Sequence, residues 1–210
     1  LMNKKIKAII FDMDGVLIDA RDWHYEALNK ALSMFGMAIS RFDHLVTYDG
    51  LPTKEKLRML SLEKGLPDGL HVFINDLKQQ FTIEEVIMKC RPVFHHQYAL
   101  ARLKGEGYKL VVCSNSIKDT ITIMLTKAGI IDYFDFYLSN QDVKKSKPDP
   151  EMYNTAIGKL GLGKDECLVV EDNENGIKSA LAAGAHLMRV YNVNDVHYQS
   201  ITHRIKEIES

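Results

Sequence analysis

Four short runs rich in valine and isoleucine place the strongest limit on the fold of this 210-residue chain. Apolar and polar residues do not alternate cleanly within them, which is typical of strands buried on both faces of a parallel sheet. The runs cover residues 6–11, 109–113, 167–170 and 186–191, and a weaker candidate covers residues 134–138. Helical patterns alternate with the runs over the second half of the chain. The sequence therefore predicts right-handed βαβ units and a doubly wound α/β fold with a parallel sheet.

Residues 20–91 interrupt this alternation. They contain no convincing strand pattern, whereas apolar residues from Trp23 to Phe35 recur at helical spacing. We therefore predict two domains. Residues 1–19 and 92–210 form the α/β core, and residues 20–91 form a small helical domain inserted after the first strand.

Charge and cysteine content exclude several classes of protein. The 27 Lys and Arg residues nearly balance the 28 Asp and Glu residues, and the net charge of −1 argues against a nucleic-acid or anionic-membrane partner. Cys90, Cys113 and Cys167 lie far apart and form no C-x-x-C pair, so neither a zinc site nor a disulfide framework is expected. No apolar run approaches the roughly 18 residues of a membrane span, and none near the amino terminus is long enough for a signal-peptide core. We expect a monomeric, cytoplasmic protein.

Two carboxylates follow the first predicted strand directly. Asp12 and Asp14 are two residues apart, and Gly15 after them permits a tight turn. Ligands of open α/β sheets bind outside the carboxyl ends of the strands. Two acids placed there repel one another unless a cation is present, and Mg²⁺ takes carboxylate ligands together with substrate phosphate. The pattern indicates a magnesium site, although an Asp-rich turn without a metal has the same spacing.

Four segments together resemble the motifs of the haloacid dehalogenase-like hydrolases. The D-M-D-G sequence that begins at Asp12 resembles the first motif, and the strand that ends at Ser114 resembles the second. Lys147, in the sequence K-P-D-P, resembles the third motif, and the acidic pair Glu171-Asp172 resembles the fourth. Each motif alone is weak, but all four occur in order over residues 6–191. The resemblance implies a Rossmann-like core of the haloacid dehalogenase type.

The resemblance implies specific roles for the residues of the first three motifs. Asp12 would be the nucleophile that forms a phosphoaspartate, and Asp14 would be the general acid that protonates the leaving oxygen and the base that then activates water. Ser114 would donate a hydrogen bond to a phosphate oxygen, with Asn115 beside it in the substrate site. Lys147 would neutralise charge on the transferring phosphoryl group. A helix cap at Ser114 and a solvated Lys147 are the alternatives that the residues alone leave open.

The resemblance also implies the ligands of the magnesium ion. Asp12, Asp14 through its backbone carbonyl, and Asp172 would hold the ion. Glu171 would either bind the ion directly or contact the residues that bind it. Glu171 and Asp172 could also favour the start of the following helix through its dipole. Asn173 stands where the family frequently has serine. This difference could change the hydrogen bonds around the metal ligands, but it removes no ligand.

The helical insert matches the cap of the family members that resemble phosphoglycolate phosphatase and β-phosphoglucomutase. A cap that closes over the site would exclude water and present side chains to the leaving group. We expect Thr53, Lys54, His24 and Lys78 to contact the substrate. The alternatives are a helix N-cap at Thr53, a packed helix histidine at His24 and a solvated lysine at position 78.

Asp14 narrows the reaction class. Haloacid dehalogenases and phosphonoacetaldehyde hydrolases lack this second acid, so the resemblance favours phosphate-ester chemistry. We expect a Mg²⁺-dependent phosphatase acting on a small phosphorylated metabolite, such as a sugar phosphate or phosphoglycolate. A phosphosugar mutase of the β-phosphoglucomutase type is the first alternative, and a non-catalytic phosphate-binding protein is the second.

Overall fold

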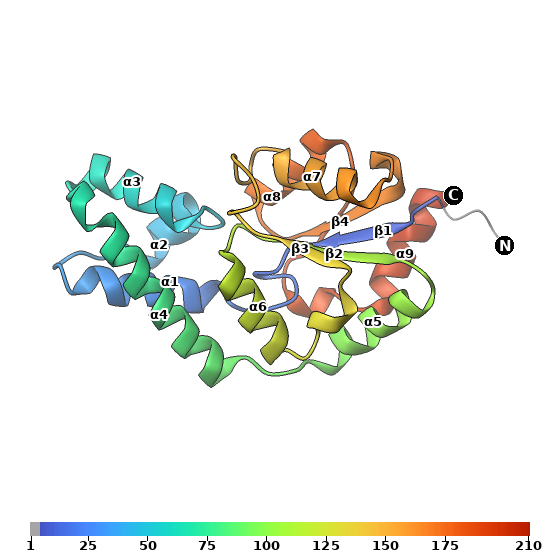
Figure 1. Ribbon diagram of the computed structural model, residues 1–210, viewed down its shortest axis with the longest axis horizontal. Helices are drawn as coiled ribbons and strands as arrows, with labels where there is room; N and C mark the ends of the chain where they lie inside the picture. The colour runs from blue at the N-terminus through green and yellow to red at the C-terminus, as the bar shows by residue number, and fades with distance from the viewer. Residues whose placement is uncertain (1–4) are drawn as a thin grey trace.

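The computed structural model describes residues 5–210 and has two parts (Figure 1). One part is a parallel β-sheet between two layers of helices. The other consists of helices α1–α4, which extend from one end of the sheet. The carboxyl-terminal residues lie at the opposite end of the molecule. Residues 1–4 of the predicted core lie outside the described residues.

The sheet confirms the predicted α/β class. Its five strands run in the order β3-β2-β1-β4-β5, and each neighbouring pair is parallel. The strands are β1 (Ala8–Phe11), β2 (Lys109–Cys113), β3 (Phe136–Leu138), β4 (Cys167–Glu171) and β5 (His186–Arg189). All five predicted runs therefore contain a strand. Strand β1 is central and pairs with both β2 and β4, so the residue that follows it lies in the middle of the sheet edge.

Both faces of the sheet are buried, which explains why the runs do not alternate. Ile9 and Phe11 of β1 face one apolar core, whereas Ala8 and Ile10 face the other, because successive side chains of a strand point to opposite faces. The helices that cover the first core are α5 (Phe94–Gly105), α6 (Lys118–Lys127) and α9 (Tyr198–Glu209), and Val86 of a further helix also belongs to it. Helices α7 (Glu151–Leu160) and α8 (Glu174–Ala183) contribute to the second.

The last helix anchors the start of the described chain. In α9, Ile201 and Ile205 are buried against the sheet, while the other face of the helix carries polar residues. The Glu209 carboxylate accepts hydrogen bonds from the backbone N–H groups of Lys5 and Ile6. Helix α9 is therefore amphipathic, and its apolar face completes the core.

The regular elements within residues 20–91 are all helical, as predicted. These elements are α1 (Arg21–Ser33), α2 (Arg41–Asp43), the π-helical turn η1 (His44–Tyr48), α3 (Thr53–Lys64), the short 3₁₀ turn η2 (Asp68–Leu70) and α4 (His71–Lys89). We call α1–α4 the cap helices. They enclose an apolar core of their own, which includes Leu28, Leu32, Leu57 and Ile74.

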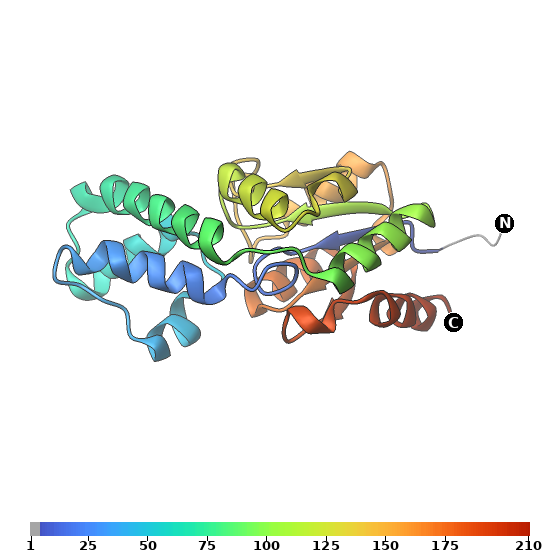
Figure 2. The same cartoon turned by 90° about the horizontal axis from the view of Figure 1, so that it is seen from below.

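Two stretches of chain join the cap helices to the sheet part (Figure 2). One follows β1 and leads into α1, and the other lies between α4 and α5. The exact limits of residues 20–91 as a domain remain a prediction. Within residues 5–210, no helix is long and apolar enough to cross a membrane. All three cysteines there are buried and free of disulfides.

Candidate active site

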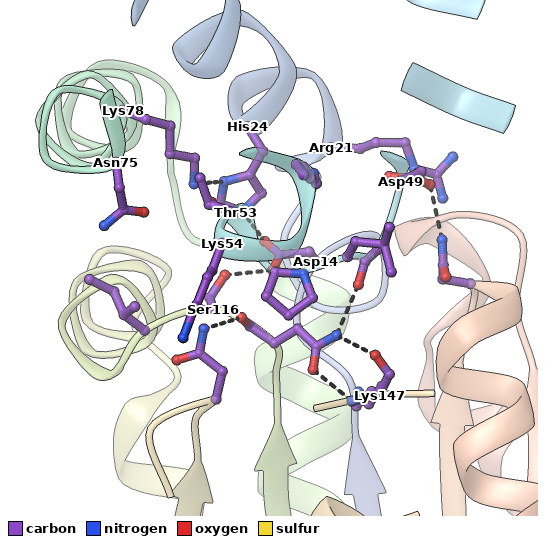
Figure 3. Close-up of a pocket in the computed structure, with 18 of the residues that line it drawn as sticks. Asp14, Arg21, His24, Asp49, Thr53, Lys54, Asn75, Lys78, Ser116 and Lys147 are labelled. Carbon is purple, nitrogen blue, oxygen red and sulfur yellow. Dashed lines mark hydrogen bonds and ion pairs between the residues drawn. The ribbon is translucent and has the colours of Figure 1, made fainter. Parts of the chain in front are cut away.

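A cavity of about 390 Å³ lies between the carboxyl edge of the sheet and the cap helices. Its sheet side is lined by residues that follow β1, β2 and β4, and its cap side is lined by α3, α4 and the loop before α3. Figure 3 shows side chains from both sides directed toward this space, with Asp14, Ser116 and Lys147 facing His24, Thr53, Lys54 and Lys78. The volume falls within the range of small-molecule sites.

Asp12 is paired with a buried lysine. The Lys147 ammonium donates to Asp12 Oδ1 at 2.8 Å, to Glu171 Oε1 at 2.7 Å and to the Cys113 carbonyl at 2.8 Å. Glu171 Oε1 also accepts the hydroxyl of Tyr153 at 2.6 Å. Burial lowers the pKa of Lys147, but the attraction of Asp12 and Glu171 outweighs it and raises the pKa above its ordinary value. Lys147 therefore stays charged beside Asp12.

Glycines make room for the acidic residues. A Cβ on Gly176, near the start of α8, would lie 1.8 Å from Glu171 Oε1. A Cβ on Gly15 would lie 2.1 Å from Asp172 Oδ2. Gly15 has φ +86°, a conformation that side chains rarely adopt. The turn after β1 can therefore approach the acidic end of β4 only with glycine at position 15.

The acids that follow β1 and β4 form a group suited to a cation. One oxygen each of Asp12, Glu171 and Asp172 lies within 4.8 Å of the others. Asp172 Oδ1 is buried without a hydrogen-bond partner, and Oδ2 accepts from the Arg21 guanidinium at 2.6 Å. Burial and the charge of Glu171 raise the pKa of Asp12 well above its usual value and that of Asp172 to about 6. Clustered hard oxygens with an unsatisfied lone pair fit Mg²⁺.

Asp14 points away from this group and into a chain of hydrogen bonds. Its Oδ1 lies 2.8 Å from Nε2 of His24, and His24 Nδ1 lies 3.2 Å from the Lys78 ammonium. Its Oδ2 accepts from the hydroxyls of Ser116 at 3.2 Å and Ser114 at 3.4 Å. Burial raises the pKa of Asp14, but the attraction of His24 outweighs it and the pKa is lowered. Burial and the Lys78 charge outweigh the attraction of Asp14 and lower the pKa of His24. Because the Asp14 carboxylate accepts at Nε2 and the Lys78 ammonium donates at Nδ1, the proton of the neutral ring lies on Nε2.

Ser114 and Asn115 both have hydrogen-bond partners within the protein, and Asn115 also lines the cavity. Ser114 is fully buried, and its hydroxyl accepts the backbone N–H of Ser116. The Asn115 side chain donates to the carbonyls of Gly50 and Lys147 and accepts from the Lys147 N–H, so it ties the loop before α3 to the loop that carries the lysine. Within the described chain, both side chains act on neighbouring protein groups, and their contact with substrate stays a prediction.

The four predicted cap residues all line the cavity, although in different ways. Thr53 is the first residue of α3 rather than its N-cap, and no side chain caps that helix. Lys54 is exposed at the rim. Lys78 is only 6% exposed, so the solvated alternative is wrong, and burial together with Lys56 lowers its pKa to about 7. His24 is not simply a packed histidine, because it bridges Asp14 and Lys78.

The sequence interpretation missed several residues of the site. Arg21 joins Asp172 to Asp49, whose carboxylate lies 3.3 Å from the Arg21 Nε. Asn173, noted as a departure from the family, donates to Asp49 Oδ2 at 3.0 Å and caps α8 through the N–H of Asn175. This link across the cleft was not visible in the sequence, because Asp49 belongs to no motif.

Two further cavity residues were also missed. Lys56 lies three residues after Thr53, so both belong to one face of α3, and this spacing was the available signal. Ser116 lines the cavity and bonds Asp14, whereas the prediction had selected Ser114 from the same loop.

Comparisons with known proteins agree with the motifs. Residues 9–190 match the family model described as "Haloacid dehalogenase-like hydrolase". A haloacid dehalogenase-like hydrolase domain-containing protein of Arabidopsis thaliana is 30% identical over 90% of this chain and 69% of its own length. A phosphorylated carbohydrates phosphatase of Thermotoga maritima is 28% identical over 90% of this chain and 85% of its own length.

A solved structure shares the fold. The β-phosphoglucomutase of Clostridium difficile superposes with a TM-score of 0.81 at 24% identity, over 96% of this chain and 98% of that protein. At this identity the likeness shows the fold alone. The family model and the Arabidopsis relative, together with the acidic site at the end of β1, lead to one conclusion: this chain is an enzyme of the haloacid dehalogenase-like hydrolase family.

Proposed function

We propose that this protein is a Mg²⁺-dependent phosphatase that hydrolyses a small phosphate monoester through a phosphoaspartate at Asp12. The observation that carries the proposal is the pairing of Asp12 with the buried ammonium of Lys147 at 2.8 Å, in a cavity that also presents Asp14. Relatives named phosphatases support the reaction class.

In the first half-reaction, an Asp12 carboxylate oxygen attacks phosphorus and the bond to the ester oxygen breaks. Lys147 orients Asp12 through Oδ1, which leaves Oδ2 for the attack, and its charge offsets that of the phosphoryl oxygens. Asp14 in its protonated form gives its proton to the leaving oxygen. Because the pKa of Asp14 is lowered in the free protein, Asp14 must take up a proton from solvent as the substrate binds, when the negative charge of the phosphoryl group raises the pKa of the carboxyl. The N–H of His24 at Nε2, 2.8 Å away, holds that carboxyl in place.

In the second half-reaction, Asp14 is a carboxylate and acts as the base. It takes a proton from water as the water oxygen attacks the phosphorus of phosphoaspartate. The bond between phosphorus and the Asp12 oxygen then breaks, which releases inorganic phosphate and restores both carboxyl groups. The lowered pKa of Asp14 suits this step, because it keeps the base ionised near neutral pH.

Asp12, Asp172 and the backbone carbonyl of Asp14 would hold the magnesium ion. Glu171 would support the site, since its Oε1 is taken by Lys147 and Tyr153 and its Oε2 accepts the Asp172 N–H. When bound, Mg²⁺ neutralises the clustered carboxylates and polarises the phosphoryl group.

Phosphate release tests the proposal directly. The panel is glucose 6-phosphate, phosphoglycolate, a nucleoside monophosphate and p-nitrophenyl phosphate, each with Mg²⁺, with EDTA, and with the Asp12→Asn variant. We expect metal-dependent release that Asp12→Asn abolishes. Release that persists in Asp12→Asn would refute the nucleophile, and no release from any ester would refute the phosphatase.

A phosphosugar mutase is the second candidate function. The observation in its favour is the series of hydrogen bonds from Lys78 through His24 to Asp14, which links cap residues to this acid. In a mutase, Asp14 would serve as acid and base in both phosphoryl-transfer steps. Product analysis with β-glucose 1-phosphate and a bisphosphate primer separates the two. Glucose 6-phosphate without net phosphate release would favour the mutase, whereas free phosphate favours the hydrolase.

A further inference from the structure

The cap side of the cavity carries cationic groups that the reaction at Asp12 does not use. We propose that Lys56, with Lys78 beside it, forms a subsite for a second anionic group on the leaving-group portion of the substrate, either a carboxylate or a second phosphate. The inference rests on the proposed function and extends it. It concerns which esters the enzyme prefers, and it assigns Lys56 as a specificity residue.

Lys56 is a buried lysine without a partner. Its side chain lies on α3, lines the cavity and is only 7% exposed. Within residues 5–210 its ammonium makes no hydrogen bond and no ion pair with a carboxylate. A buried ammonium without a counter-ion is unfavourable. Accordingly, burial lowers the pKa of Lys56 to about 8, which still leaves the side chain mainly protonated at pH 7.

The two acidic residues near Lys56 form hydrogen bonds and ion pairs with other residues. Asp49 accepts from Asn173 and pairs with Arg21. Asp14 accepts from His24 and Ser116. Both carboxylates attract Lys56 and offset part of the effect of its burial, but neither forms a hydrogen bond or an ion pair with its ammonium within the described residues.

Two further groups make the Lys56 side of the cavity favourable for an anion. The charge of Lys56 contributes to the lowered pKa of Lys78, so the two ammoniums repel one another. His44 lines the cavity, is 1% exposed, and neither of its ring nitrogens has a hydrogen-bond partner. An anion held by Lys56 would relieve the repulsion between the lysines.

The charged residues on the two sides of the cavity determine how a substrate would be oriented in it. The phosphoryl group to be transferred belongs beside Asp12 and Lys147 on the sheet side, so the leaving group extends toward α3 and α4 (Figure 3). An adjoining groove is lined by Lys54, Arg58, Lys144 and Lys145, and its one acidic residue, Glu55, pairs with Arg58. Basic side chains beside the cavity favour the approach of a multiply charged ester.

Matched substrate pairs test the subsite. The first pair is phosphoglycolate and 2-hydroxyethyl phosphate, which differ by a carboxylate, and the second is glucose 1,6-bisphosphate and glucose 6-phosphate, which differ by a phosphate. We expect the wild-type enzyme to prefer the more anionic member of at least one pair by about 10- to 100-fold in kcat/KM, as for a charged hydrogen bond in a buried site. The pair that shows the preference identifies the anion.

Variants assign the preference to Lys56. Lys56→Met keeps the apolar stem, and we expect it to abolish the preference by raising KM for the more anionic member. Lys56→Arg restores charge and should recover part of the preference. Lys64→Met, at an exposed position of the same helix, is the matched control.

The outcomes distinguish this inference from the proposed function. Equal kcat/KM within both pairs, in wild-type enzyme that releases phosphate, overturns the subsite and leaves the phosphatase intact. A preference that survives in folded Lys56→Met also overturns it. No release from any of the four esters or from p-nitrophenyl phosphate overturns both. If Lys56→Met fails to fold, equal kcat/KM within both pairs of wild-type enzyme still overturns the subsite, and Lys56→Gln replaces Lys56→Met in assigning any preference to Lys56.

Discussion

Replacing Lys147 by methionine should destabilise the protein strongly at pH 8. The ammonium makes three buried hydrogen bonds, two of them to the carboxylates of Asp12 and Glu171, and the side chain is only 4% exposed. Methionine preserves the stem but leaves buried acids without their cation. Removing one partner of a buried ion pair typically costs about 3–5 kcal/mol. We expect a loss of that size in the free energy of unfolding, measured by urea titration without added metal.

The loss should depend on pH in a defined direction. Without Lys147 the pKa of Asp12, already raised by burial and by Glu171, rises further. When the pKa of a carboxyl group is higher in the folded protein than in the unfolded chain, where it is about 3.9, the protein becomes less stable as the pH rises between the two values. The stability that Lys147→Met loses relative to wild type should therefore be smaller at pH 5 than at pH 8. The control is Lys145→Met, whose exposed pair with Asp149 spans 3.8 Å and is worth about 0–1 kcal/mol. Equal losses in the two variants, or a deficit independent of pH, would refute the reasoning.

Three further predictions address the metal site, the cap loop and Lys78. Mg²⁺ at about one hundred times its dissociation constant should add about 2.7 kcal/mol to the free energy of unfolding, and EDTA or Asp172→Asn should remove the gain in a urea titration. Gly50→Ala should lower that free energy by about 1–3 kcal/mol and reduce kcat/KM for phosphate release, because φ is +72° and a Cβ would lie 2.4 Å from Asn173 Oδ1. Finally, burial lowers the pKa of Lys78 from 10.5 to about 7, so the unfolded chain binds more protons between these values. The stability of wild type relative to Lys78→Met should therefore rise from pH 7 to pH 9, by at most about 1.4 kcal/mol per pH unit.

The positions of the strands were predictable, whereas some of their ends were not. A strand buried on both faces needs a continuous apolar run, and this is why the run at 109–113 matches β2 completely. The run at 6–11 is longer than β1, because Ile6 is buried beneath α9 without pairing in the sheet. Burial and strand pairing give the same sequence signal, so the pattern could not separate them.

The sheet side of the site was also predictable. Parallel strands bring their carboxyl ends to one edge, so Asp12, Lys147 and Asp172 had to converge once the strand order was set. The structure adds what spacing could not supply, namely that Lys147 reaches both Asp12 and Glu171. It also shows Ser116, rather than Ser114, lining the cavity.

The cap side was harder to predict for a physical reason. Whether a lysine on a helix is solvated depends on which face the packing of that helix turns inward. The sequence left a solvated lysine open as the alternative at position 78 and did not single out Lys56, whereas in the structure both side chains are buried. Arg21 was missed because its partners Asp49 and Asp172 are far from it in the sequence.

Trapping the phosphorylated enzyme tests the central claim most directly. Asp14→Asn lacks the base for the second half-reaction, and p-nitrophenyl phosphate has a leaving group that needs little help from an acid. The account predicts a burst of p-nitrophenolate close to the enzyme concentration, followed by slow turnover. Borohydride added during the burst should convert residue 12 to homoserine, as detected by peptide mass spectrometry. Steady release of phosphate without a burst, with Asp12 unmodified, would contradict a phosphoaspartate at this position.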